Sequence, residues 1–114
     1  PVIEIITKEG FYDYKNKYTS GCTEYLCPAP LSIEITQKLG SFAVAAHKSL
    51  GCRSYSRIDF RITENGEIYA LEANTAPGMT ATSLVPKSAK AYGLSFPEFL
   101  ESVIRVSFNI KRRF

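Results

Sequence analysis

The sequence predicts an α+β fold in which a few mostly antiparallel strands have helices packed on one face. Residues 57–75 alternate apolar and polar side chains on either side of Asn65-Gly66, which is the pattern of a β-hairpin. Residues 33–50 and 96–108 instead carry apolar side chains at helical spacing. With 114 residues, the chain has room for one domain with a small hydrophobic core.

The first half of the chain is predicted to contain two short strands and one helix. Residues 2–7 alternate around isoleucines and predict a strand, and residues 25–27 predict a second, shorter one. Ser32 is a typical N-cap residue, so the first helix is expected to begin directly after it. Gly51 is expected to end that helix.

Two more helices are expected after the hairpin. Residues 83–92 predict a short helix, because Pro86 is tolerated in a first turn and Gly93 follows as a stop signal. Ser95 and Glu98 have the spacing of a capping box at the start of the last helix. The predicted apolar face of that helix consists of Phe96, Phe99, Leu100, Val103, Ile104 and Phe108.

Composition is that of a globular protein outside the membrane, with 45% hydrophobic and 22% charged residues. The net charge of +3 partly reflects residues 111–113 and does not indicate a nucleic-acid partner. No apolar run approaches the roughly 20 residues of a membrane span. The chain begins at Pro1, within a predicted strand, so we expect it to be a piece of a longer polypeptide.

The three cysteines, Cys22, Cys27 and Cys52, are an odd number without close pairing, which indicates a reducing, cytoplasmic setting. Together with His47 they match a loose zinc pattern, C-x4-C…H-x4-C. His47 and Cys52 fall on either side of the predicted helix end. This favours a helix-surface or boundary position for His47 over a zinc site.

The hairpin carries a candidate metal site. If its strands pair about Asn65-Gly66, Asp59 lies opposite or near Glu72. Facing carboxylates repel each other unless a cation lies between them. With the Asn74 amide they form a set of hard oxygen ligands, which suits Mg²⁺ or Mn²⁺ holding phosphate groups. Strict alternation along the second strand places four residues on one face, namely Ile68, Ala70, Glu72 and Asn74.

The turn after these residues adds a second feature. Gly78 follows Ala76-Pro77, and its backbone amide can approach a substrate closely. Metal ligands followed by an exposed amide indicate phosphoryl-transfer chemistry. The alternative is a solvated strand face in which Arg57 and Arg61 form ordinary ion pairs with the carboxylates.

A resemblance to a known family runs over essentially all 114 residues. The segments that carry it are FYDYKNKY (11–18), TEYLCPAPLS (23–32), LGCRSYSRIDF (50–60), IYALEANTAPGMTATSLVPKSAKAYGLSF (68–96) and the closing helix. They resemble the C-terminal part of the D-alanine–D-alanine ligases, which belong to the ATP-grasp superfamily. The resemblance implies that residues 1–114 form the C-terminal part of an ATP-grasp domain. The N-terminal and central domains would be missing, so this piece alone should be inactive, and the intact protein would be a cytoplasmic homodimer.

In this family ATP phosphorylates the carboxylate of one D-alanine, and the amine of a second D-alanine attacks the acyl phosphate. The product, D-alanyl-D-alanine, enters peptidoglycan precursors. The resemblance implies two Mg²⁺ ions, with Asp59 and Asn74 each holding one and Glu72 bridging both. It also implies that Arg57 and the Gly78 amide stabilise the developing oxyanion. For Arg57 alone, a structural ion pair with Asp59 or Glu72 is the other interpretation.

The remaining roles also come from the resemblance. Ser83 and the Leu84 amide resemble the groups that hold the carboxylate of the second D-alanine, although Ser83 could instead be a plain N-cap. Lys17 resembles a lysine that contacts the phosphoryl group. Tyr18 resembles a tyrosine near the first D-alanine. Phe11 resembles an aromatic residue packed on adenine, or else it is a core residue.

Two other classes of function stay open. One is a different ATP-grasp carboxylate–amine ligase or a D-alanine–D-lactate ligase. Lys17-Tyr18 argues against the latter, because D-lactate relatives place a histidine in that loop and this chain has none before His47. The other class is a noncatalytic binding protein with the same fold, against which the clustered Asp59 and Glu72 argue.

Overall fold

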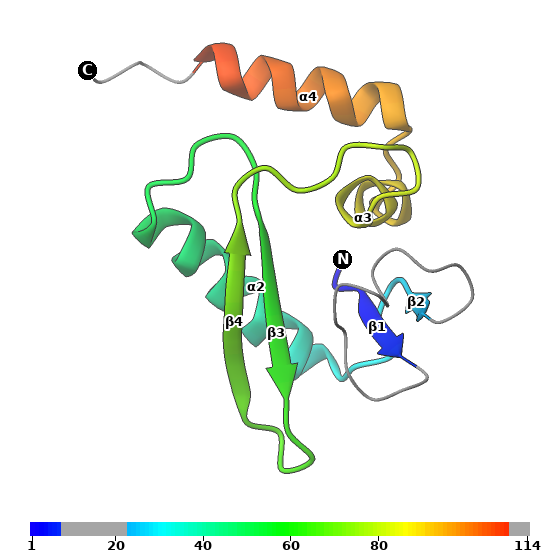
Figure 1. Ribbon diagram of the computed structural model, residues 1–114, viewed down its shortest axis with the longest axis vertical. Coiled ribbons are helices and arrows are strands. Elements are labelled where there is room, and N and C mark those ends of the chain that lie inside the picture. Colours follow the sequence, from blue (N-terminus) through cyan, green and yellow to red (C-terminus); the bar gives the residue numbers. More distant parts are fainter. Residues whose placement is uncertain (8–22, 110–114) are drawn as a thin grey trace.

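The computed structural model describes residues 1–7 and 23–109, and these form an α+β arrangement (Figure 1). Its elements are β1 (Glu4–Thr7), β2 (Thr23–Leu26), α2 (Ile33–Ser49), β3 (Arg57–Ile62), β4 (Ile68–Asn74), α3 (Leu84–Tyr92) and α4 (Phe96–Asn109). The strands are antiparallel, as predicted. Within the described ranges they form two separate hairpins, β1–β2 and β3–β4, instead of one sheet.

The predicted helix ends are confirmed. The hydroxyl of Ser32 accepts a hydrogen bond from the Ile35 amide at 3.3 Å, so it caps α2. Gly51 follows the last turn with φ of 66°, a left-handed conformation that glycine adopts without strain. At the start of α4 the Ser95 amide donates to Glu98 at 2.7 Å, and the Glu98 amide donates to the Ser95 hydroxyl at 3.4 Å. These two bonds form the predicted capping box.

Helices cover the hairpins from different sides. Helix α2 packs on one face of β3–β4, while α3 packs against α4 (Figure 1). Helix α3 also reaches the first hairpin, because the Lys87 ammonium lies 4.6 Å from the centre of the Tyr25 ring. The Ser88 hydroxyl donates to the Pro1 carbonyl at 2.7 Å. Segments far apart in the sequence are therefore joined around α3.

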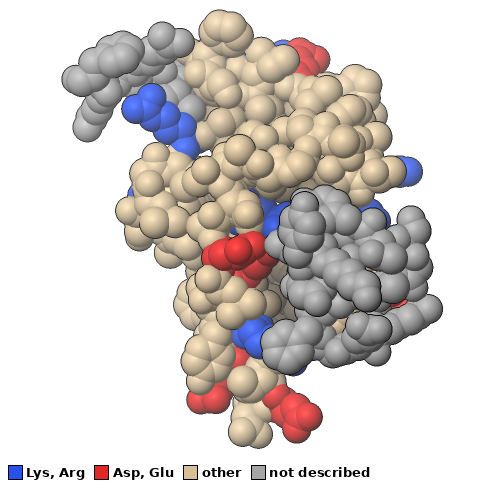
Figure 2. Space-filling model, in the orientation of Figure 1, with Lys and Arg blue, Asp and Glu red and all other residues tan. Residues whose placement is uncertain are grey.

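The core of the described residues is thin. Leu39 of α2 and Phe99 of α4 are its buried aliphatic and aromatic side chains. The Phe99 ring meets Tyr55 edge to face, with ring centres 6.4 Å apart. The predicted apolar face of the last helix is only partly covered, since Ile104 and Phe108 are exposed. Figure 2 shows a mostly uncharged surface over α3 and α4. No helix in residues 1–7 and 23–109 is long and apolar enough to cross a membrane.

The turn between β3 and β4 is one residue longer than a two-residue Asn65-Gly66 turn. The Gly66 amide donates to the Thr63 carbonyl at 2.9 Å, and the Thr63 amide donates to the Glu67 carbonyl at 2.9 Å. Gly66 has φ of 81°. This is a type I turn followed by a left-handed glycine, the common form of a three-residue hairpin loop. If the strand register set by this turn continued along both strands, Leu71 would lie opposite Asp59.

A β-bulge in β4 shifts the register by one residue and so compensates for the longer turn. Phe60 pairs with Ala70 but Asp59 pairs with Glu72, so Leu71 is an extra residue in β4. The longer turn and the bulge cancel, and Asp59 faces Glu72 as predicted. The face assignment within β4 was only half right, because cross-strand partners share a face. Glu72 lies with Asp59, whereas Ala70 lies with Phe60 on the opposite face.

Candidate functional site

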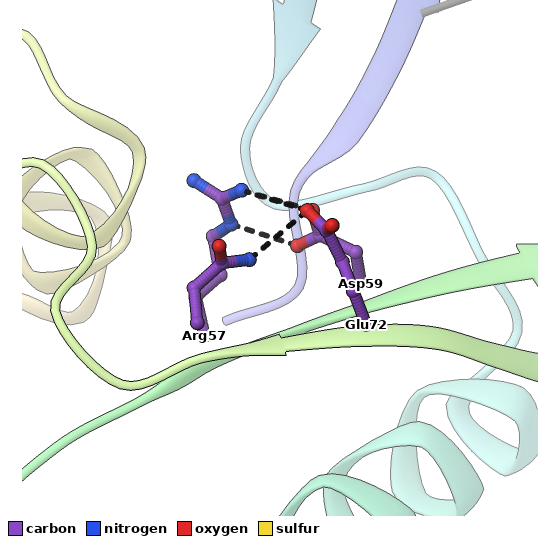
Figure 3. A network of polar contacts seen from close by, with 4 residues as sticks. Arg57, Asp59 and Glu72 are labelled. Carbon is purple, nitrogen blue, oxygen red and sulfur yellow. Dashed lines mark hydrogen bonds and ion pairs between the residues drawn. The ribbon is translucent and has the colours of Figure 1, made fainter.

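Four polar side chains gather on the face of the β3–β4 hairpin away from α2. Arg57 pairs across the strands with Asn74, and Asp59 pairs with Glu72. Because positions two apart on a strand point the same way, all four side chains project from one face. Figure 3 shows Arg57, Asp59 and Glu72 directed toward one another above the two strands. The fold therefore brings Asp59 and Glu72 together on one face, as expected from the sequence.

The Arg57 guanidinium links the two carboxylates. Its Nε and Nη2 atoms donate to the two oxygens of Asp59 at 2.7 and 2.9 Å, a two-pronged bond that fixes both planar groups. Nη2 also lies 3.8 Å from Oε1 of Glu72. The Asn74 amide nitrogen donates to that same oxygen at 3.2 Å. The ion pair weighed as an alternative for Arg57 is thus present.

Burial differs across this cluster. The side chains of Arg57 and Asp59 are 22% and 18% exposed, whereas that of Glu72 is 50% exposed. The Arg57–Asp59 pair is thus partly shielded from water, which strengthens its electrostatic attraction. Glu72 keeps an open side through which a ligand can approach.

The donor set fits a divalent cation. Two carboxylates face each other, and the Asn74 amide lies within hydrogen-bonding distance of one of them. These are hard oxygen ligands of the kind that Mg²⁺ takes together with phosphate oxygens. The Arg57 guanidinium already contacts both carboxylates, so this part of the surface attracts positive charge. The cluster holds two carboxylates and an amide, and nowhere in the described residues are three His, Cys, Asp or Glu side chains grouped to hold a metal.

The alternative zinc pattern finds no support in the described part of the chain. Nδ1 of His47 lies 2.7 Å from the Ser56 hydroxyl, which ties the end of α2 to the segment before β3. Cys27 and Cys52 are free thiols. Cys22 lies outside the described residues.

The loop between β4 and α3 folds around Ser83. The Ser83 hydroxyl accepts from the Thr80 amide at 3.1 Å and lies 2.7 Å from the Thr80 hydroxyl. A Cβ atom on Gly78 would lie only 2.9 Å from that same hydroxyl oxygen. The absence of a side chain at Gly78 thus allows the loop backbone to approach the Ser83 hydroxyl closely. Thr80 is not among the site residues predicted from the sequence, although a Thr and a Ser three positions apart before a helix is a visible signal for such a contact.

Ser83 occupies the N-cap position of α3 but makes no capping hydrogen bond. Its side chain is turned to the Thr80 loop instead, so the plain N-cap interpretation is wrong for the hydroxyl. Helix α3 has no acidic residue in its first turn, and Pro86 has no amide hydrogen. The helix start therefore presents the amides of Leu84 and Val85, whose positive dipole end favours an anion.

Three predicted site residues lie outside the part of the chain that the structure describes. Phe11, Lys17 and Tyr18 lie in residues 8–22, outside the described ranges. Their roles stay predictions.

The chain belongs to a known ligase family. The family described as "D-ala D-ala ligase C-terminus" matches residues 1–105. The D-alanine–D-alanine ligase of Methylacidiphilum infernorum is 47% identical over 108 residues, which are 95% of this chain and 36% of that protein. The chain spans about a third of the length of the curated relatives it matches.

Solved ligase structures share the fold. The D-alanine–D-alanine ligase from Bacillus anthracis complexed with ATP aligns with a TM-score of 0.66 at 35% identity, over 70% of this chain and 28% of that one. The VanG D-Ala:D-Ser ligase from Enterococcus faecalis aligns with a TM-score of 0.74 at 38% identity, over 91% of this chain and 30% of that one. The predicted family and α+β fold class are confirmed.

Proposed function

We propose that the protein containing this chain joins two D-alanine molecules in an ATP-dependent reaction, through an acyl phosphate. The chain would be the C-terminal part of its ATP-grasp domain. The observation that carries the proposal is the convergence of Arg57, Asp59, Glu72 and Asn74 on one hairpin face. Family membership and the ATP complex of a relative support ATP as the phosphoryl donor. The dipeptide would serve peptidoglycan synthesis in the cytoplasm, and the intact protein would be a homodimer.

Asp59, Glu72 and Asn74 would hold two Mg²⁺ or Mn²⁺ ions, with Glu72 shared between them. When bound, such ions neutralise phosphate charge and orient the phosphoryl group for transfer. Asp59 and Glu72 are directly opposite each other, so a shared position between their oxygens is within reach of both. The 50% exposure of Glu72 leaves that position open to a nucleotide.

Arg57 and Gly78 would act on the acyl-transfer step. The attack of an amine on an acyl phosphate puts negative charge on the carbonyl oxygen, and fixed donors stabilise that charge. Asp59 holds the Arg57 guanidinium through two hydrogen bonds, so its direction is set before substrate arrives. Gly78 brings a backbone amide without the steric bulk of a side chain.

Ser83 and the Leu84 amide would bind the carboxylate of the second D-alanine. A hydroxyl and a helix-start amide adjacent in sequence are suited to the two oxygens of one carboxylate. Lys17 would contact the transferring phosphoryl group, Tyr18 would close the site near the first D-alanine, and Phe11 would pack on adenine. These last three roles rest on the sequence resemblance alone.

A ligase with another acceptor is the second candidate. The similarity to a D-Ala:D-Ser ligase, at 38% identity, favours D-serine as the alternative acceptor. A D-alanine–D-lactate ligase, or another ATP-grasp carboxylate–amine ligase, would be a further variant of the same chemistry. For a noncatalytic protein with the same fold, the contacts of Arg57 with Asp59 and Glu72 would already offset the repulsion between the carboxylates. Membership of a ligase family favours the ligase over this alternative.

The deciding experiment measures phosphate release by the full-length protein with Mg²⁺-ATP. The conditions are D-alanine alone, D-alanine with D-serine, D-alanine with D-lactate, and no amino acid, with the products identified by mass. Release with D-alanine alone and formation of D-alanyl-D-alanine is the expected result. Phosphate release that requires D-serine or D-lactate would show that this molecule, and not a second D-alanine, is the acceptor. No phosphate release under any condition would refute ligase activity.

A further inference from the structure

The side chain of Ser83 is held by the residue three positions before it. Its hydroxyl accepts from the Thr80 amide at 3.1 Å and lies 2.7 Å from the Thr80 hydroxyl. It makes no capping bond to α3, and a side chain on Gly78 would collide with it. The loop before α3 is therefore shaped around this one hydroxyl group.

The direction of these hydrogen bonds decides what Ser83 can offer to a ligand. A serine hydroxyl has one proton and two lone pairs. When Thr80 donates from both its amide and its hydroxyl, both lone pairs of Ser83 are occupied and its proton remains. An ionised carboxylate only accepts hydrogen bonds, so it selects this arrangement over the reverse one, in which Ser83 donates to Thr80.

We infer that Thr80 is a positioning residue that makes the Ser83 hydroxyl a donor directed at the carboxylate of the acceptor amino acid. This inference rests on the proposed function. Thr80 acts through Ser83: its two donations fix the hydroxyl oxygen in place, and each bond in such a chain polarises the next. Loss of the Thr80 hydroxyl should therefore weaken acceptor binding while the chemical step is preserved.

The test compares three single variants of the full-length protein. Thr80→Val removes the hydroxyl at nearly constant shape and keeps the backbone amide, and Thr80→Ser keeps both donors. Thr82→Val is the matched control, because the Thr82 hydroxyl lies 3.4 Å from that of Thr80, beyond the usual length of an O–H···O bond. Initial rates of phosphate release are measured over a range of D-alanine concentrations and fitted to two amino-acid sites.

Thr80→Val is expected to raise the KM of the acceptor site by about 3- to 10-fold, the effect of one lost hydrogen bond. The kcat of Thr80→Val should stay within about 2-fold of wild type. For Thr80→Ser and Thr82→Val, both kcat and the acceptor KM should stay within about the same range. In a Ser83→Ala background, Thr80→Val should add no further change, because the hydroxyl to be positioned is gone.

An unchanged acceptor KM in Thr80→Val would overturn the inference. The inference would also be overturned if Thr80→Val raised the acceptor KM equally in the Ser83→Ala background, since that result would indicate a general structural role of Thr80. Thermal unfolding of each variant is measured in parallel, and Thr80→Ala replaces Thr80→Val if the latter does not fold. Wild-type protein without D-alanine-dependent phosphate release would refute the proposed function itself, before any variant is compared.

Discussion

Replacing Gly78 with alanine tests the close approach of the β4–α3 loop to Ser83. The new methyl group would lie 2.9 Å from the Ser83 hydroxyl oxygen and 3.5 Å from its Cβ. The first distance is too short, so the Ser83 side chain must rotate or the loop must move. Rotation of the Ser83 side chain would break its two hydrogen bonds to Thr80, and a shift of the loop would lengthen them.

The magnitude follows from those two bonds. They are exposed, so each contributes about 0.5–1 kcal/mol, the lower part of the usual range. Their joint loss is therefore about 1–2 kcal/mol, which corresponds to a factor of about 5–30 in an equilibrium or a rate. We expect the kcat/KM for D-alanine to fall by this factor in Gly78→Ala, because the Gly78 amide and the Ser83 hydroxyl are displaced together.

The assay is phosphate release by the full-length protein, with thermal unfolding measured on the same samples. Gly40→Ala is the matched control, because a Cβ atom at Gly40, within α2, meets nothing within 4 Å. In the control, alanine should raise stability by about 0.5–1 kcal/mol and leave activity unchanged. Wild-type kcat/KM in Gly78→Ala would refute the close approach that the structure shows.

Three further predictions concern the metal ligands, a helix cap and the core. Glu72→Gln should lower Mg²⁺-dependent turnover at least about 100-fold with little change in Tm, because Glu72 is half exposed; normal turnover would contradict the metal assignment. The pKa of Glu98 is lowered from its ordinary value of 4.5 by hydrogen bonds from the Ser95 hydroxyl and amide. Its ionised form therefore stabilises the protein above that pH, and the contribution is lost as the pH falls through the lower, folded-state pKa. The Tm difference between wild type and Glu98→Gln should shrink as the pH falls below 4.5, and a pH-independent difference would rule out this linkage. Phe99→Ala should destabilise by about 3 kcal/mol in urea unfolding and Phe99→Leu by less than about 1.5 kcal/mol; equal small effects would argue that Phe99 does not anchor α4.

Local signals were enough to predict most elements. Ser32 caps α2 and Ser95 with Glu98 caps α4, because a capping side chain acts within three residues of itself. The hairpin was also predicted, since a left-handed glycine such as Gly66 marks its turn. These features depend on neighbouring residues, so they can be recognised without knowledge of the rest of the fold.

The predicted pairing of Asp59 with Glu72 is confirmed, but the predicted two-residue turn is not what produces it. A two-residue turn would give this pair directly, but the molecule reaches it through a longer turn and a compensating bulge at Leu71. Alternation along a strand carries no information on where a bulge occurs, because strand pairing and packing against α2 select its position. This is why Ala70 was assigned to the wrong face.

The ligase family, the hairpin and the residues of the polar cluster can all be recognised from the sequence, because residue types at fixed spacings carry them. The contact of Arg57 with both Asp59 and Glu72, in contrast, could be seen only in the folded molecule. The same holds for the Ser83 hydroxyl, which contacts Thr80 and does not cap α3. In both cases a polar side chain had more than one partner within reach, and the choice depends on the distances that the folded backbone imposes.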